Sequence, residues 1–155
     1  MSATFTASIA WQRGDARFTD KRYSRAHTWT FDGGAVVAAS SSPHSVPLPY
    51  SDPRGVDPEE ALVAALASCH MLFFVGACAR DGWVLDSYAD EPVAAMSKNA
   101  AGKAYISRIV LRPRLVFSGE NQPSPAQVAA LHHWSHEECY IANSIRAEVV
   151  IEPRP

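Results

Sequence analysis

The chain has 155 residues, which is enough for one domain or for one half of an intertwined dimer, but too few for two well-buried cores. Its hydrophobic fraction of 47% and charged fraction of 19% are typical of a globular protein and exclude a disordered one. The net charge of −2 gives no long-range attraction for nucleic acid or for an anionic membrane, so we expect neither as a partner.

The first ten residues and the cysteine content both predict a cytoplasmic protein. Met1–Ala10 lacks the basic segment and apolar run of a secretion signal. The three cysteines, Cys69, Cys78 and Cys139, are too few and odd in number for a secreted disulfide scaffold. In a reducing cytoplasm such thiols are buried filler, metal ligands or redox groups.

The N-terminal third has an extended pattern. Residues 5–11 contain an alternating stretch, and residues 27–31 alternate before the turn signal Asp32-Gly33-Gly34, which leads into residues 35–37. Residues 40–54 are rich in Ser and Pro, so we expect a loop there.

A long helix is predicted next, with clear signals at both ends. Asp57 can act as N-cap, Pro58 suits the first helical position, and Glu60 stands three residues after the cap. Asp81-Gly82 supplies the stop. The apolar run 61–79 approaches the length of a membrane span, but its acidic start and the lack of basic flanks favour a central helix. Because the helix is apolar nearly all round, we expect it to be covered on most sides.

The second half continues with strands. Residues 83–96 have a strand-like pattern in which Pro92 indicates an edge or a bulge, and 97–103 is a hairpin candidate. Residues 105–117 alternate along one predicted strand, and its arginines are interpreted as a solvated face. The apolar face consists of Ile109, Leu111, Leu115 and Phe117, and the polar face of Arg108, Arg112 and Arg114.

A second helix is predicted from Ser124 or Pro125 towards Glu138, and residues 147–151 form a final strand. The order of strands, helix, strands, helix and strand indicates an α+β fold.

Composition alone does not distinguish reactive cysteines from structural ones, because free cysteine is among the most buried residue types. Cys69 lies inside the apolar helix. Cys78, nine residues on, lies half a helical turn around and about 13.5 Å along the axis, too far for a disulfide within one helix. Cys139 follows His136-Glu137-Glu138 where the second helix is expected to end.

Two segments resemble motifs of the OsmC/Ohr peroxide-resistance proteins. Asp57-Pro58-Glu59-Glu60, the alanine-rich run and Cys69 are similar to that family's helix, in which a reactive cysteine stands ten residues after the first Glu. Cys139-Tyr140-Ile141-Ala142-Asn143-Ser144 resembles the second motif, with Tyr140 in place of the Pro often found there. The resemblance implies a single OsmC-like domain over residues 1–155. It also implies antiparallel sheets wrapped around long central helices, and an intertwined homodimer.

The resemblance further implies a thiol peroxidase without a cofactor or a metal. Cys69 would be the peroxidatic thiol, Cys139 the resolving thiol, and Glu59 the carboxylate that positions a catalytic Arg. One branch of the family places that Arg on the first strands, which favours Arg25, whereas the other branch favours Arg54 in the loop before the helix. We prefer Arg25. The implied substrates are organic hydroperoxides, with hydrogen peroxide as a second candidate, and the implied reductant is a lipoyl-type or small dithiol.

The chemistry requires a cation near Cys69. A thiolate is the nucleophile, and an ordinary cysteine with a pKa of about 8.5 is only a few per cent ionised at pH 7. Cys69 lies about three turns into the helix, beyond the reach of the helix dipole, so an Arg is the natural candidate. Glu59 and Cys69 are ten residues apart, about 15 Å along one helix. A Glu59 from a second copy of the chain therefore fits better than one from the same copy.

Other interpretations remain open at this stage. Met71, Phe73 and Phe74 could line an apolar substrate pocket, although such residues more often form core. His133, His136 and Cys139 are spaced three residues apart, with His132 adjacent, and zinc accepts such ligands. Side chains three residues apart, however, point in successively different directions around a helix over two turns. A non-catalytic OsmC-like protein that binds a small molecule between subunits would keep the fold and lack the peroxidase.

Overall fold

The computed structural model describes residues 3–155, so the first two residues of the Met1–Ala10 stretch lie outside the described part. The chain forms two compact units, one ending at Ala61 and one beginning at Leu62, and each is described by itself. The prediction of a single domain over residues 1–155 stays a prediction.

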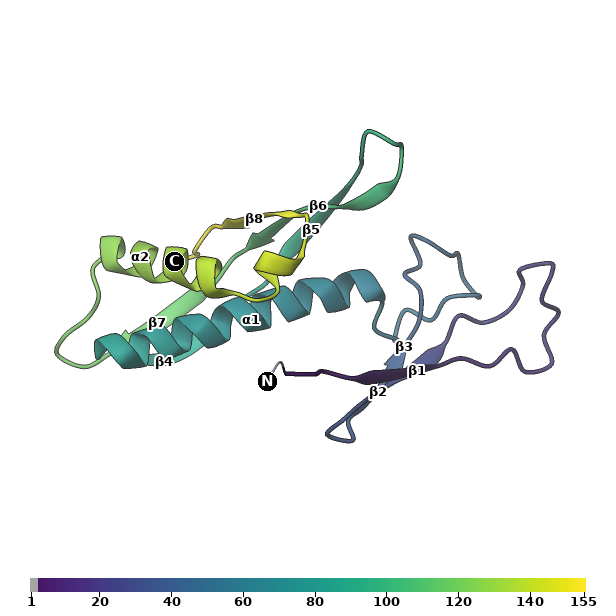
Figure 1. Cartoon of the computed structure of the whole chain (residues 1–155), viewed down its shortest axis with the longest axis horizontal. Coiled ribbons are helices and arrows are strands. Elements are labelled where there is room, and N and C mark those ends of the chain that lie inside the picture. The colour runs from purple at the N-terminus through teal and green to yellow at the C-terminus, as the bar shows by residue number, and fades with distance from the viewer. Residues whose placement is uncertain (1–2) are drawn as a thin grey trace. The chain divides into compact units, whose positions relative to one another are not determined.

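The N-terminal unit is built on a three-stranded antiparallel sheet in the order β1-β2-β3 (Figure 1). Its strands are β1 (Ala7–Ala10), β2 (His27–Phe31) and β3 (Val36–Ala39). The turn between β2 and β3 is closed by a hydrogen bond of 2.9 Å from the Gly34 amide to the Phe31 carbonyl, and Gly34 has φ +86°. The strands and the turn predicted from the alternating pattern are confirmed.

The predicted loop after β3 returns to pair with that strand. The Val56 amide donates to the Ala38 carbonyl at 2.9 Å, and the Ser40 amide donates to the Val56 carbonyl at 3.1 Å. Gly55 makes the close approach possible, because a Cβ at this position would lie 2.9 Å from the Ala39 carbonyl carbon. The serines of this loop are thereby held beside the sheet.

Helix α1 (Pro58–Asp81) has the predicted bounds. Asp57 and Glu60 form a capping box, in which each backbone amide donates to the other's carboxylate at 2.8 Å. At the other end Gly82 has φ +80°, and the Trp83 amide donates to the Cys78 carbonyl at 2.9 Å. The sequence signals at both ends are therefore confirmed.

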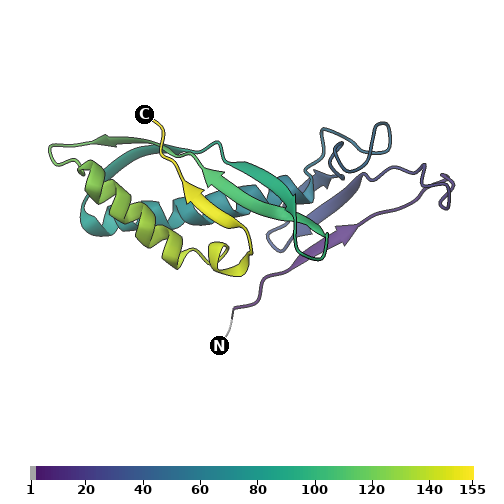
Figure 2. The ribbon, with the colours of Figure 1, turned by 90° about the horizontal axis from the view of Figure 1, so that it is seen from above.

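The C-terminal unit holds two sheets, β4-β7 and β5-β6-β8. Their strands are β4 (Val84–Ala89), β5 (Val93–Lys98), β6 (Ala104–Leu111), β7 (Arg114–Ser118) and β8 (Glu148–Ile151). All pairs are antiparallel except β6 with β8, which is parallel. The second sheet and the two helices of the unit can be followed in Figure 2.

The prediction of one strand over residues 105–117 was wrong, because the chain changes sheet between β6 and β7. The same happens between β4 and β5, inside the predicted stretch 83–96. A proline stands at each break, Pro113 and Pro92, where its missing N–H cannot continue a ladder. The Arg112 amide donates to the Asp90 carboxylate at 2.6 Å, which ties the two breaks together.

Helix α2 (Pro125–Glu138) begins as predicted, with Ser124 as N-cap in a capping box with Gln127. A short 3₁₀ helix, η1 (Ala142–Ser144), leads from α2 into β8. Two buried clusters join α1 to the rest of the unit. One contains Leu66, Ile109, Leu111 and Cys139, and the other Phe74, Ala77, Cys78 and Leu131.

Helix α1 is covered on one face only, so the expectation of cover on most sides is not met within one chain. Leu66, His70 and Phe74 are buried, whereas the side chains of Leu72 and Val75 are 64% and 42% exposed. By length and hydropathy α1 would suit a membrane span, a test that the central helix of a soluble protein also passes. Its buried face packs against both sheets and α2, as expected of a core helix.

Candidate active site

Cys69 and Cys139 come together in the C-terminal unit. Cys69 lies in the middle of α1 and is half-buried, whereas Cys139 is the fully buried residue that ends α2. The two side chains pack together in one buried cluster, and their thiols are close enough to interact. Burial, and next the neighbouring Cys69 thiol, raise the pKa of Cys139 to about 11. Cys139 is thus held as a neutral thiol beside Cys69 at pH 7.

The turn after α2 fixes the position of the Cys139 sulfur. The Ala142 amide donates to Cys139 Sγ at 3.4 Å. The Asn143 side chain donates to the Glu137 carbonyl at 2.8 Å and to the Cys139 carbonyl at 3.1 Å, which satisfies the end of the helix. Asn143 belongs to the motif that begins at Cys139, and its capping role was not predicted from the sequence.

Tyr140 is exposed beside the thiol pair. Its side chain is 72% exposed, and its ring meets the ring of Phe73 edge-on at 5.2 Å between centroids. The Phe73 ring also packs against the ring of Trp134 in α2, with 6.1 Å between the ring centroids. The aromatic ring at position 140 therefore covers part of α1 next to Cys139.

Cys78 lies away from this pair. It is buried in the second cluster, and burial raises its pKa to about 11. Its burial in a cluster that contains no second cysteine agrees with the structural role expected for it.

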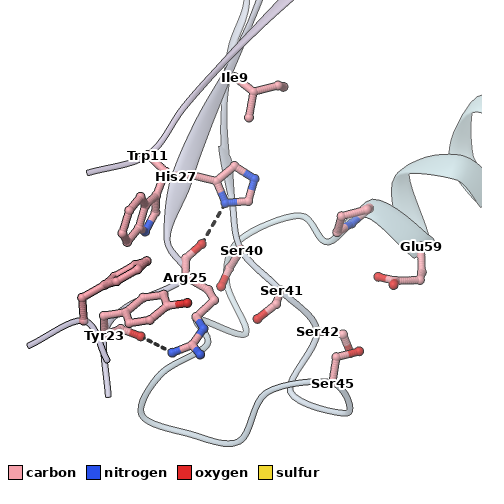
Figure 3. A pocket seen from close by; sticks show the side chains of 12 residues that line it. Ile9, Trp11, Tyr23, Arg25, His27, Ser40, Ser41, Ser42, Ser45 and Glu59 are labelled. Carbon is pink, nitrogen blue, oxygen red and sulfur yellow. Dashed lines mark hydrogen bonds between the residues drawn. The ribbon is translucent and has the colours of Figure 1, made fainter. Parts of the chain in front are cut away.

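Arg25 and Glu59 line one pocket of the N-terminal unit, with a volume of about 470 Å³ (Figure 3). The Arg25 guanidinium donates to the backbone carbonyl of Lys21 at 2.7 Å and to that of Tyr23, and it lies 3.9 Å from the centre of the Tyr23 ring. Glu59 makes no hydrogen bond or salt bridge with Arg25 among residues 3–155, and the two side chains lie apart in Figure 3.

Arg54 lies in a different environment. It pairs with Asp52 at 2.9 Å, its side chain is 88% exposed, and it is not part of the pocket wall. Of the two candidates, Arg25 is therefore the one that shares a pocket with Glu59. Which of them is catalytic stays a prediction.

Aromatic side chains form one wall of the pocket. The rings of Trp11, Phe18 and Tyr23 pack together, with 5.0 to 6.1 Å between ring centroids. Trp11 Nε1 also donates to the Ser24 carbonyl at 2.8 Å. This wall was not predicted from the sequence, in which Met71, Phe73 and Phe74 were the candidate pocket residues. Phe74 is fully buried in the core.

Polar groups complete the pocket. The Ser41 hydroxyl faces it as a buried group without a partner among the described residues. His27 has both ring nitrogens engaged, Nδ1 with the Arg25 carbonyl at 2.8 Å and Nε2 with the Trp29 indole N–H at 2.9 Å. Since a carbonyl only accepts and an indole N–H only donates, Nδ1 is the donor and Nε2 the acceptor in these two bonds. His27 is therefore occupied as a structural link and is not free to act as a base.

The histidines of the predicted zinc alternative do not converge on one point. His133 is exposed on α2, whereas Cys139 is buried in the core. Within the part of the chain that the structure describes, no group of three or more His, Cys, Asp or Glu side chains is placed to hold a metal ion.

Comparison with known proteins identifies the family. The model of the OsmC-like protein family matches residues 51–154, so the chain belongs to the OsmC-like family. No curated protein matches the chain. An OsmC-like protein of unknown function from Vibrio cholerae is 49% identical, with a TM-score of 0.96 over 99% of this chain and 100% of that one.

More distant structures share the fold. The organic hydroperoxide resistance protein OhrB of Bacillus subtilis is 16% identical, with a TM-score of 0.67 over 98% of each chain. An organic hydroperoxide resistance protein from Elizabethkingia anophelis is 11% identical, with a TM-score of 0.70 over 99% of this chain and 95% of that one. These comparisons confirm the predicted family and the α+β fold class.

Proposed function

We propose that this protein is a thiol-dependent peroxidase that reduces organic hydroperoxides to alcohols in defence against oxidative stress. The observation that carries the proposal is the meeting of Cys69 and Cys139 in one buried cluster, although they belong to different helices. Because the two side chains pack together, a sulfenic acid formed on Cys69 can condense with the Cys139 thiol to a disulfide, with release of water.

The reaction has three steps. The Cys69 thiolate attacks the terminal peroxide oxygen, the O–O bond breaks, and the departing alkoxide takes a proton to become the alcohol. The oxidised sulfur, now a sulfenic acid, condenses with the Cys139 thiol, forming the S–S bond and releasing water. An external dithiol, of the lipoyl type by family resemblance, then reduces the disulfide and is itself oxidised to a disulfide.

The cation for Cys69 comes, in this proposal, from a second copy of the chain. Glu59 and Cys69 are ten residues apart on one helix, about 15 Å along its axis, so they cannot both contact one small substrate within the same copy. Arg25 shares its pocket with Glu59. A twofold dimer brings the Arg25 and Glu59 of one copy to the Cys69 of the other, and there Glu59 orients the guanidinium.

The exposed face of α1 supports such a homodimer. Leu72 and Val75 are large apolar residues on the side of the helix that its own chain leaves uncovered. An apolar face of this kind on a central helix is typical of an interface. The cover that the sequence pattern predicts for α1 would then be completed by the partner.

The lining of the pocket supports organic hydroperoxides as the substrates in this proposal. Trp11, Phe18 and Tyr23 offer apolar ring faces, and Arg25 and the Ser41 hydroxyl offer donors for peroxide oxygens. A volume of about 470 Å³ lies within the range of small-molecule sites. Organic hydroperoxides with an apolar or aromatic body fit this lining better than hydrogen peroxide, which has no apolar part to bury. We place the reaction in the cytoplasm, where three free thiols stay reduced.

A second candidate is a non-catalytic protein that binds an apolar small molecule. The observation that favours it is the aromatic pocket itself, which is built from the N-terminal unit without either cysteine of the pair. In that case the pocket would bind its ligand equally well in a protein that lacks Cys69.

A peroxide-consumption assay with a dithiol separates the two candidates. The native protein, Cys69→Ser and the matched control Cys78→Ser are compared with cumene hydroperoxide as substrate. The peroxidase requires Cys69→Ser to lose activity and Cys78→Ser to keep it, because Cys78 lies in the other cluster. Equal rates in the native protein and in Cys69→Ser would overturn the proposal and leave the binding protein.

A further inference from the structure

His70 of α1 and His132 of α2 form a buried pair with no assigned role. The His70 Nε2 and His132 Nδ1 atoms lie 3.0 Å apart, and the two rings are nearly parallel, at 14°. The residues are only 1% and 3% exposed. The pair is therefore a direct hydrogen bond between the two helices.

The pair joins the same two helices that carry the thiols. His70 directly follows Cys69, and His132 precedes Cys139 by seven residues, which is two helical turns. Helix α1 carries one thiol and α2 ends in the other. A contact that fixes α1 against α2 here also fixes the separation of Cys69 and Cys139.

From this placement we infer that His70 and His132 are positioning residues for the thiol pair, whose hydrogen bond holds Cys139 against Cys69 and is released by acid. The inference deepens the proposed peroxidase by naming what keeps its two thiols together. The inference rests on the proposed function only where it assigns the two thiols to a catalytic cycle, because the placement of Cys139 can be measured without any peroxide.

The buried histidine pair leaves two polar atoms without hydrogen-bond partners. A neutral imidazole carries one N–H and one lone pair, and only one proton fits between the facing nitrogens. His70 Nδ1 and His132 Nε2 are buried without a partner among residues 3–155. One buried N–H and one buried lone pair are thus left unsatisfied whichever tautomers form. Two apolar side chains would fill this space without leaving polar atoms unsatisfied. We therefore interpret the polar pair as a contact that fixes the position of α1 relative to α2.

The surroundings disfavour a charge on either ring. On α1, Phe74 stacks on His132 at 4.3 Å and also contacts Tyr88 of β4, whose hydroxyl is buried. On α2, His136 is the titratable group whose charge acts on His70, besides His132 itself. Among residues 3–155, no carboxylate acts on either ring.

Burial is the first cause that lowers the pKa of both histidines to about 4, and the charges of His132 and His136 lower that of His70 further. In an opened state both rings return towards the ordinary pKa of 6.5. Separation of α1 from α2 at this contact therefore takes up as many as two protons when the pH lies between about 4 and 6.5. Its equilibrium constant rises by up to about 100-fold for each pH unit that is lost.

The test measures how well Cys139 is protected from a thiol reagent that reacts in acid. In a Cys69→Ser/Cys78→Ser background, Cys139 is labelled with 4,4′-dithiodipyridine at pH 7.0, 6.0 and 5.5. Each rate is divided by that of the urea-unfolded protein at the same pH. We expect the protection to fall about 50-fold from pH 7.0 to 5.5. A change of less than about threefold overturns the inference, and no peroxide is used, so the result is independent of the proposed activity.

A conservative double variant separates positioning from packing. His70→Gln keeps a donor near the Nε2 position and His132→Asn keeps an acceptor near the Nδ1 position, so the hydrogen bond survives without its titration. This variant should protect Cys139 at pH 7.0 as the parent does and show no fall in protection by pH 5.5. His133→Asn, which alters an exposed neighbour, should follow the parent. A double variant that keeps the parent's acid sensitivity would overturn the inference, and if it does not fold, the parent's own profile still decides.

Discussion

Arg25 and Glu59 line one pocket, yet they make no contact with each other. The guanidinium is held instead by two backbone carbonyls and by the face of Tyr23. Both of these hydrogen bonds come from one nitrogen of the guanidinium, so its other N–H groups can donate to a further group. In the proposed dimer that group is the Cys69 thiolate and its peroxide.

Replacing this cation should remove most of the activity. We expect Arg25→Ala to lower the peroxidase rate at pH 7 about 100-fold, the effect of losing roughly 2.7 kcal/mol of thiolate stabilisation. Arg54→Ala is the matched control, because Arg54 is exposed and paired with Asp52. Steady-state rates with both variants check the prediction. A large loss in Arg54→Ala with none in Arg25→Ala would transfer the role to Arg54.

The shared site requires a dimer, which a charge on the open face of α1 should break. Leu72→Glu puts a carboxylate on a side chain that is 64% exposed in one chain and covered in the proposed dimer. Sedimentation at micromolar concentration should give a dimer for the parent and for the control Ala129→Glu on α2. It should give a monomer with little activity for Leu72→Glu. A parent protein that is monomeric yet fully active would refute the shared site.

The aromatic wall should determine the preference for substrate. Phe18→Ala removes one ring from the pocket, and we expect the KM for cumene hydroperoxide to rise about tenfold, as the loss of one buried ring face suggests. The KM for hydrogen peroxide should stay within about twofold. Phe5→Ala serves as the control, because Phe5 is 88% exposed and lies outside the pocket lining. Equal changes for both peroxides would exclude the wall as a specificity determinant.

Acid should destabilise the fold through the two buried histidines. Their pKa is about 4 in the folded chain against 6.5 for the free side chain, so the unfolded state binds more protons between these values. The free energy of unfolding is therefore largest above pH 6.5 and falls as the pH is lowered towards 4. We expect a loss of about 2 kcal/mol for each histidine at pH 5. Urea titrations at pH 7.5 and 5 measure it, and an unchanged midpoint would show that the pair is not buried in solution.

The sequence predicted those parts of the fold that depend on local signals. The cap at Asp57, the stop at Gly82 and the second helix after Ser124 are all formed by side chains within a few residues of the boundary. The change of sheet at Pro113 was missed because the alternating pattern of residues 105–117 continues across it, and Pro92 was interpreted as an edge or a bulge. The hydrogen bond between Arg112 and Asp90 that joins them is a long-range contact.

Some residues of the candidate site were also predicted from the sequence, and others were not. Family resemblance supplied Cys69, Cys139, Glu59 and Arg25, and the placement of the two cysteines side by side agrees with it. The aromatic wall was not foreseen, because Phe18 and Tyr23 come from an irregular segment without a periodic pattern. The pairing of His70 with His132 was also missed, since 62 residues separate them and no local signal joins them.

The intact mass of the protein after reaction with one equivalent of an organic hydroperoxide decides whether Cys69 and Cys139 are the redox pair. We expect the native protein and Cys78→Ser to lose two hydrogens and to yield a disulfide-linked peptide pair containing Cys69 and Cys139. Cys139→Ser should instead gain one oxygen, as the sulfenic acid of Cys69. A native protein that keeps its mass, or a Cys139→Ser variant that loses two hydrogens as readily as the native protein, would rule out this redox pair.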